Sequence, residues 1–171
     1  HFRNMPVSTI AEARARLAAG YALDQLCGAT MGLPDGDSKE RPLRLVAQLL
    51  ERECVPYALI GGVAVQLHTE EPRSTLDIDL AVPTYADVPR EALLGAGFEH
   101  TGRHDHSDNW RAPGPGALKQ RTAVQFSAED EGIADAVEHA NIVDLDGGVQ
   151  LRVATVADLI VLKLVAAAEP R

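Results

Sequence analysis

The strongest constraint on the fold of this chain is an apolar strand that runs into two glycines and is followed by two alternating aspartates. The strand covers residues 57–60, the glycines are Gly61 and Gly62, and the aspartates are Asp77 and Asp79. Successive side chains of a strand point to opposite faces, so the two carboxylates share one face with Cα atoms roughly 6.6 Å apart. This order predicts a strand, a helix and a second strand within one α/β unit.

The residue types in this motif suit a site for phosphate and metal. Two carboxylates on one strand face repel each other unless a cation lies between them, and such oxygen ligands suit Mg²⁺, which takes its other ligands from water and substrate phosphates. Glycines at the start of a helix let backbone N–H groups approach a phosphate without interference from a Cβ atom. The alternative is a buried crossover whose glycines only ease packing, but it leaves the two acids flanking Ile78 unexplained.

Together with Arg73 and Thr75 ahead of the aspartates, this pattern resembles the nucleotidyltransferase superfamily. It looks most like the small bacterial nucleotidyltransferases of toxin–antitoxin and abortive-infection systems, over residues 43–98. The resemblance implies an α/β (α+β) fold, with a mixed β-sheet flanked by helices. It also implies transfer of a nucleoside monophosphate from a nucleoside triphosphate to a hydroxyl of a protein or RNA.

The same resemblance assigns roles to individual residues. Asp77 and Asp79 would be the catalytic residues and the ligands of one or two Mg²⁺ ions. Gly61 and Gly62 would shape the pocket for the nucleotide phosphates, and Arg73 would contact phosphate oxygens. An arginine just ahead of a strand is also commonly a solvated charge, so this second interpretation of Arg73 stays open.

Lys163 interrupts the apolar run 159–165 near the end of the chain. A lysine there either extends its ammonium group to the surface or meets an anionic partner. In the nucleotidyltransferases that the chain resembles, a Leu-Lys-Leu sequence on a C-terminal helix places its lysine near the nucleotide phosphates. Lys163 is therefore predicted to bind nucleotide, with the helix-surface interpretation beside it.

The chain departs from the family pattern at a third carboxylate, which active members carry on a later strand. The matching run is 123–126, where Gln125 is a neutral amide that cannot accept a proton. Two classes of function therefore remain. One is a Mg²⁺-dependent nucleotidyltransferase, and the other is a catalytically reduced protein of the same fold that binds a nucleotide or a partner protein without turnover.

The composition fits one domain over residues 1–171, because 46% of the residues are hydrophobic. A capping box at Thr9 and Glu12 opens a helical extension at about 9–28, which offers a surface for a homodimer or a cognate partner protein. The net charge of −9 opposes an electrostatic grip on nucleic acid over the whole surface. We interpret the net positive, histidine-containing segment 100–125 as a solvated loop, with a local basic face or a metal site as alternatives.

Cysteine usage and hydropathy indicate the setting. Cys27 and Cys54 are far apart and have no zinc or redox spacing, so we expect reduced thiols in the core. The apolar run 159–168 is interrupted by Lys163 and is too short to span a bilayer, and no leader pattern is recognised. We expect a cytoplasmic protein with no membrane attachment.

Local patterns predict the remaining elements. We expect a helix from 43 to about 54, a short helix at 88–94, strands at 110–111 and 123–126, a hairpin of 142–145 with 149–153, and a final helix capped by Thr155.

Overall fold

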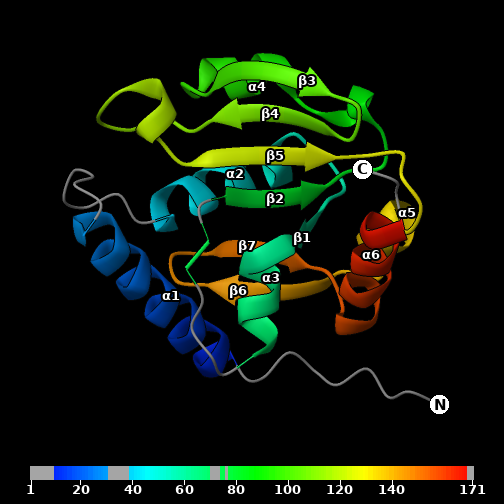
Figure 1. The fold of residues 1–171 in the computed structure, drawn as a ribbon, viewed down its shortest axis with the longest axis horizontal. Coiled ribbons are helices and arrows are strands. Elements are labelled where there is room, and N and C mark those ends of the chain that lie inside the picture. Colours follow the sequence, from blue (N-terminus) through cyan, green and yellow to red (C-terminus); the bar gives the residue numbers. More distant parts are fainter. Residues whose placement is uncertain (1–9, 31–38, 70–73, 76, 169–171) are drawn as a thin grey trace.

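The structure is a computed structural model that describes residues 10–30, 39–69, 74–75 and 77–168. Its strands are β1 Ala58–Ile60, β2 Asp77–Ala81, β3 Glu99–His104, β4 Ser107–Arg111, β5 Ala123–Ser127, β6 Asn141–Leu145 and β7 Val149–Val153. They form one seven-stranded sheet in the order β3-β4-β5-β2-β1-β7-β6 (Figure 1). The pairs β2·β5 and β1·β7 are parallel and the other neighbours are antiparallel. The predicted mixed sheet is therefore confirmed.

Helices flank this sheet on both faces. The α-helices of the described part are α1 Ile10–Thr30, α2 Glu40–Arg52, α3 Gly61–His68, α4 Arg90–Gly95, α5 Ile133–Glu138 and α6 Val156–Ala168, with 3-10 turns η1 Tyr85–Asp87 and η2 Leu118–Gln120. In Figure 1, α2 and α4 lie behind the sheet and α3 lies in front of it. None of these helices crosses in front of β4 or β5 in that view. The described α-helices therefore leave this part of the front face uncovered beside α3.

The short strand β1 places the glycine pair next to the aspartates. Its residues Ala58 and Leu59 are fully buried, which is expected for an apolar strand at the centre of a sheet. Ile60, the last residue of β1, pairs with Asp79 of the antiparallel neighbour β2. Because α3 begins at Gly61, the start of this helix lies directly beside the Asp79 carboxylate.

The back of the sheet forms the main hydrophobic core. α2 turns Leu43, Val46 and Leu50 toward it at helical spacing, and all three are fully buried. On β2, Ile78 and Leu80 are also fully buried, so they lie on the face opposite to Asp77 and Asp79. Alternation along β2 thus anchors the strand by one face and presents both acids on the other.

Several local predictions are confirmed. β6 and β7 form the expected hairpin, and β5 covers the expected strand at 123–126. Thr155 caps α6, since its Oγ1 accepts a hydrogen bond of 3.2 Å from the Asp158 N–H. The helix predicted from 43 begins earlier, at Glu40, where an acidic residue suits the first turn.

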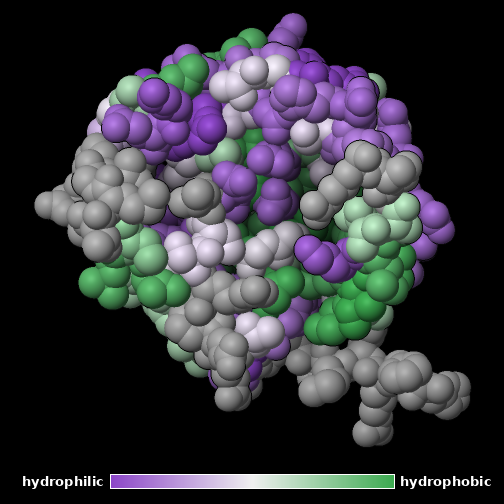
Figure 2. Space-filling model, in the orientation of Figure 1, coloured by the Kyte–Doolittle hydropathy of each residue, from purple (hydrophilic) through white to green (hydrophobic). Residues whose placement is uncertain are grey.

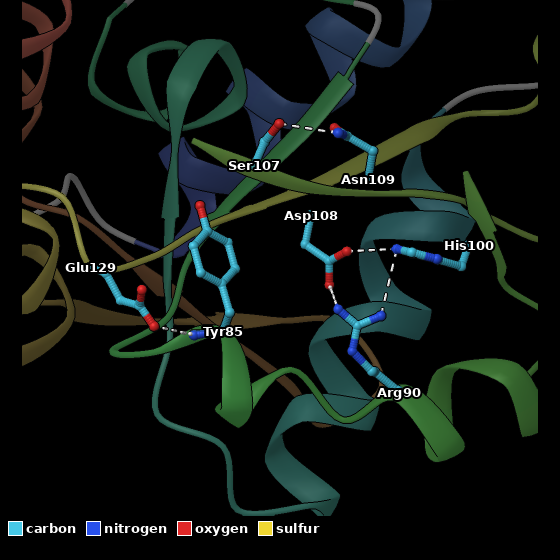
Figure 3. A network of polar contacts seen from close by, with 7 residues as sticks. All are labelled: Tyr85, Arg90, His100, Ser107, Asp108, Asn109 and Glu129. Carbon is cyan, nitrogen blue, oxygen red and sulfur yellow. Dashed lines mark hydrogen bonds and ion pairs between the residues drawn. The ribbon is translucent and has the colours of Figure 1, made fainter. Parts of the chain in front are cut away.

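The interpretation of residues from 100 onward as a solvated loop is wrong at its N-terminal part, where β3 and β4 form a hairpin. Asp108 of β4 is completely buried, and its carboxylate accepts hydrogen bonds of 2.7 Å from Arg90 of α4 and 2.7 Å from His100 of β3 (Figure 3). The His100 ring lies against Trp110 with ring centroids 4.8 Å apart. This part of the segment is therefore an ordered, ion-paired element of the sheet.

The cysteines and the hydropathy of the helices bear on the expected cellular setting. Cys54 is exposed just after the end of α2, with a φ of 54°, so the expectation of a core thiol is wrong there, whereas Cys27 is half-buried. Both thiols are free. Across the described ranges, no helix has the length and apolar character needed to cross a membrane.

Candidate active site

The predicted glycine and aspartate motifs meet at one point of the sheet. Gly61 has a φ of +66°, a left-handed conformation that favours glycine, and a Cβ atom added there would lie 2.1 Å from Oδ2 of Asp79. No larger residue fits this position without moving the carboxylate. Gly61 is thus required both by its backbone conformation and by its contact with the aspartate.

The Asp77 and Asp79 pair is an uncompensated negative centre. The pKa of Asp79 is raised to about 6, first by burial and then by the negative charge of Asp77, while a hydrogen bond from the Gly62 N–H acts in the opposite direction. Among the described residues, no lysine, arginine or histidine forms an ion pair with either aspartate. Burial beside a second carboxylate therefore disfavours the charged form of Asp79 in the folded protein.

Two neutral amide side chains lie next to the aspartates on the neighbouring strands β5 and β4. Asp79 pairs with Gln125 of β5, and Gln125 pairs with Asn109 of β4, so the three side chains share one face. The Gln125 Nε2 donates a long hydrogen bond of 3.4 Å to Oδ2 of Asp77. This register confirms that Gln125 lies beside the aspartates, whereas its correspondence to the third carboxylate of the family pattern stays a prediction.

The second glycine faces the segment that leads into β2. A Cβ atom added to Gly62 would lie 2.3 Å from Cγ2 of Thr75, and the Thr75 hydroxyl donates to the Asp77 carbonyl oxygen at 3.2 Å. Thr75 therefore packs against the start of α3 on one side and fixes the start of β2 on the other.

A cavity of about 720 Å³ opens next to the glycine pair, between α3 and α6. Gly61, Gly62 and Thr75 lie at one side of it, whereas Lys163 comes from α6. The rest of the α6 wall is aliphatic, contributed by Val156, Leu159, Ile160, Leu162 and Ala166. The structure thus brings the two glycines and Lys163, which are a hundred residues apart in the sequence, to one cavity whose glycine end adjoins Asp79.

The space-filling view shows a hollow beside this cavity. In Figure 2, hydrophilic groups gather at the centre of the molecule over β2 and β5, and an apolar strip lies over α6. Lys163 itself is exposed, as the helix-surface interpretation requires, but it also lines the cavity, as the nucleotide-binding interpretation requires. Arg73, the other predicted phosphate ligand, lies outside the described residues.

Two residues of this region have no role predicted above. The Nε2 of His68, at the end of α3, lies 2.8 Å from the Ala154 carbonyl oxygen, and the residue also lines the cavity. Asn109 was unassigned because it lies in a polar run with no apolar alternation. Only strand register shows that it lies in the row of Asp79.

The donor set fits a magnesium ion better than a transition metal. Within the described residues, no group of three or more histidine, cysteine, aspartate or glutamate side chains is arranged to hold a metal, which also leaves the alternative of a histidine site in segment 100–125 without support there. Two carboxylates with neighbouring amide oxygens are hard oxygen ligands, and Mg²⁺ is commonly bound through one or two carboxylates with water and substrate phosphates completing the shell.

Comparison with known proteins gives fold likeness only. No protein-family model and no curated protein matches the chain. Three solved structures are similar to it: an antigenic nucleotidyltransferase-like protein from Paracoccidioides brasiliensis (20% identity, 72% of this chain, TM-score 0.49), a nucleotidyltransferase candidate from Helicobacter pylori (16%, 73%, 0.47) and JHP933 from the same bacterium (16%, 73%, 0.46). The chain spans 63%, 56% and 54% of their respective lengths.

Proposed function

We propose that this protein is a Mg²⁺-dependent nucleotidyltransferase that moves a nucleoside monophosphate from a nucleoside triphosphate to a hydroxyl. The observation that carries the proposal is the Asp77–Asp79 pair, which has no ion-pair partner among the described residues and whose Asp79 carboxylate lies against Gly61, a residue that lines the cavity. Within the proposal, the acceptor is a protein or RNA, the setting is cytoplasmic, and the biological role is of the toxin–antitoxin kind.

Each residue of the site has its own role in the proposed reaction. Gly61 and Gly62 let the Asp79 carboxylate and Thr75 pack against the start of α3, where a phosphate would bind, and Lys163 of α6 lines the same cavity. Asp77 and Asp79 would hold the magnesium ion, which when bound neutralises charge on the triphosphate. Asn109 and Gln125 lie on the side of the aspartates away from the cavity, where they offer hydrogen-bonding groups to an incoming hydroxyl.

In the proposed transfer, the acceptor oxygen bonds to the α-phosphorus while the bond from that phosphorus to the α,β-bridging oxygen breaks. Pyrophosphate leaves with the electron pair. The hydroxyl proton passes to a carboxylate of the Asp77–Asp79 pair. Gln125 and Asn109 cannot take it, because amide groups do not act as bases near neutral pH.

Gln125 also supports a second candidate function. An amide in the row of Asp79 removes one carboxylate from the face that would otherwise gather metal and base. A protein that keeps the cavity and the aspartate pair but lacks the third acid is suited to bind a nucleotide without turning it over. Binding of nucleotide is common to both candidates, and transfer separates them.

The experiment measures binding first and transfer second. Calorimetric titration with each nucleoside triphosphate should show affinity that strengthens with Mg²⁺ and is lost in Asp77→Asn. The matched control is Asp144→Asn, because Asp144 and Asp146 repeat the same spacing at the β6–β7 hairpin, away from the cavity. Equal binding by wild type and Asp77→Asn would contradict the proposal.

Transfer is followed with labelled triphosphates and a lysate separated into protein and RNA fractions. Mg²⁺-dependent label in either fraction supports the enzyme. Gln125→Asp provides a further comparison, since a restored carboxylate should raise a weak transfer rate by about 10²-fold or more if a base is limiting. Binding without transfer by either protein would favour the non-catalytic candidate.

A further inference from the structure

A buried ion pair outside the proposed site reaches toward it from the N-terminal helix. Asp24 lies on α1, and Lys39 lies just before α2. Their charged groups are 2.5 Å apart, with only 9% and 7% of the respective side chains exposed. Burying such a pair is expensive in solvation and is often no better for stability than an apolar pair, so its presence calls for another explanation.

Both members of the pair also bind the segment that leads into β2. The Lys39 ammonium donates to the Thr75 carbonyl oxygen, and Asp24 accepts a hydrogen bond of 3.1 Å from the Ser74 hydroxyl. Ser74 and Thr75 both line the cavity. The ion pair therefore holds two consecutive residues of the cavity wall from behind.

The held residues connect directly to the glycine and aspartate motifs. Thr75 packs so closely over Gly62 that a Cβ atom there would be 2.3 Å from its methyl group, and its hydroxyl donates to the Asp77 carbonyl oxygen. A shift of Thr75 would therefore change both the space above the backbone of Gly62 and the start of the strand that carries the aspartates. Displacements of this kind are costly at a site that depends on geometry.

α1 is in turn fixed to α3 at the far end of the cavity. Arg16 donates a hydrogen bond of 2.9 Å to the Leu67 carbonyl oxygen, and Gln66 donates one of 2.6 Å to the Arg16 carbonyl oxygen. Gly20 of α1 lets the Gln66 side chain approach, because a Cβ atom there would lie 1.8 Å from Nε2 of Gln66. The helix thus contacts the end of α3 through these bonds and the Ser74–Thr75 segment through Asp24.

We infer that Asp24 and Lys39 are positioning residues of the proposed nucleotide site, which they serve by fixing Ser74 and Thr75 against Gly62. This inference rests on the proposed function for its ligand, a Mg²⁺–triphosphate complex. It gives α1, which the sequence suggested as a partner-binding extension, a role within the site.

The test replaces the ion pair by apolar side chains of similar size. In Asp24→Leu/Lys39→Met, no charge is left buried and unpaired, so folding should be retained. Affinity for Mg²⁺–ATP, the probe used, should nevertheless fall about tenfold, because Ser74 and Thr75 lose their supports. A double variant that melts like wild type and binds Mg²⁺–ATP equally well would overturn the inference.

The matched control is Glu51→Leu/Arg152→Met. This pair is also a close ion pair, with its charged groups 2.7 Å apart, and neither residue lines the cavity. It should leave Mg²⁺–ATP affinity unchanged. An equal loss of affinity in both double variants would overturn the inference, because the effect would then follow from any lost ion pair.

Hydrogen exchange separates this inference from the proposed function. Without nucleotide, amide exchange in peptides covering 74–81 should be faster in Asp24→Leu/Lys39→Met than in wild type, and unchanged in the control. If wild type binds no triphosphate, the proposed function fails, and faster exchange at 74–81 still supports the positioning role. Unchanged exchange there overturns the role whatever the protein binds.

Discussion

Asp79 and Asp108 lie on neighbouring parts of one sheet and differ in what surrounds them. Asp108 is on the core face, paired with the fully buried Phe126, and the Arg90 guanidinium and the His100 imidazole both reach its carboxylate. Asp79 is on the open face, beside a second carboxylate, with its pKa raised to about 6. The carboxylate of Asp108 is hydrogen-bonded by the protein itself. The charged form of Asp79 lowers the stability of the folded protein, because its pKa is raised by burial and by Asp77.

Asp108 stabilises the fold through its partners, whereas Asp79 has no ion-pair partner among the described residues. Burial alone does not distinguish them, since Asp108 is the more buried of the two. The distinction comes from their partners. Burial and a neighbouring like charge both raise the pKa of a carboxyl group, and both act on Asp79.

Two predicted changes in stability are the largest and are similar in size, and the first concerns Asp108, whose carboxylate is bound by the protein itself. Arg90→Leu should lower the free energy of unfolding by about 2–3 kcal/mol, because Asp108 would keep only His100 as a partner in a fully buried position. Chemical denaturation measures the change. The matched control is Arg52→Leu, which removes an exposed ion pair with Glu53 and should cost less than about 1 kcal/mol. Equal effects would show that Asp108 does not depend on Arg90.

The next effect has the opposite sign. Asp79→Asn should raise the free energy of unfolding of the metal-free protein by about 2–3 kcal/mol at pH 7.5, since a folded-state pKa raised from 3.8 to about 6 penalises folding once the group is charged. The penalty is absent below the unfolded value, grows as the pH rises from about 4 to 6 and is constant above. The stabilisation should therefore vanish toward pH 4.

Thermal melts in chelator at several pH values test this second prediction. Asp144→Asn is the control, because Asp144 is exposed on β6. A destabilised Asp79→Asn protein at pH 7.5 would mean that the carboxylate is already compensated, and the contrast with Asp108 would fail.

A smaller effect is expected at the second glycine. Gly62→Ala should destabilise the protein by about 1–2 kcal/mol, because the new Cβ meets the Thr75 methyl group. Thr75→Ser removes that methyl and keeps the hydroxyl, so the double variant should recover most of the loss. Denaturation curves of the two single variants and the double variant give the coupling energy. Additive effects would show that Gly62 and Thr75 do not press on each other.

The smallest effect on stability concerns Lys163, the lysine that lines the cavity. Lys163→Met should leave the free energy of unfolding within about 0.5 kcal/mol, since Lys163 is exposed. Mg²⁺–triphosphate affinity should fall several-fold, by about 1 kcal/mol, if the ammonium contacts phosphate. Unchanged affinity would leave Lys163 as a surface lysine of α6.

The open site was predictable from the sequence because its signals are local. Alternation placed Asp77 and Asp79 on one face, and the short antiparallel connection from β1 through α3 to β2 brought them to Gly61. Gln125, the partner of Asp79 in β5, was found through the resemblance to the nucleotidyltransferases, whose pattern has a third carboxylate on a later apolar strand. The placing of the two aspartates needed only strand periodicity and the order of the elements.

The ion-paired environment of Asp108 was not predictable. β3 is an edge strand with no buried residue and no apolar alternation, so it resembles a loop in sequence. Asp108 lies in a polar run, and its partner Arg90 is on a helix 18 residues earlier. The same holds for Asp24 and Lys39, whose pairing depends on how α1 packs. Contacts between polar groups on different elements leave no periodic trace.

β1 has only three residues, and this shortness affects how firmly the two sides of the cavity are joined. β1 meets β7 in register only at Leu59 and Val153, with one further hydrogen bond of 3.0 Å from the Ala154 N–H to the Leu59 carbonyl oxygen. A seam with so few backbone bonds is where a sheet opens at least cost. α6 follows β7 directly, so opening this seam would draw the aliphatic wall of the cavity away from α3.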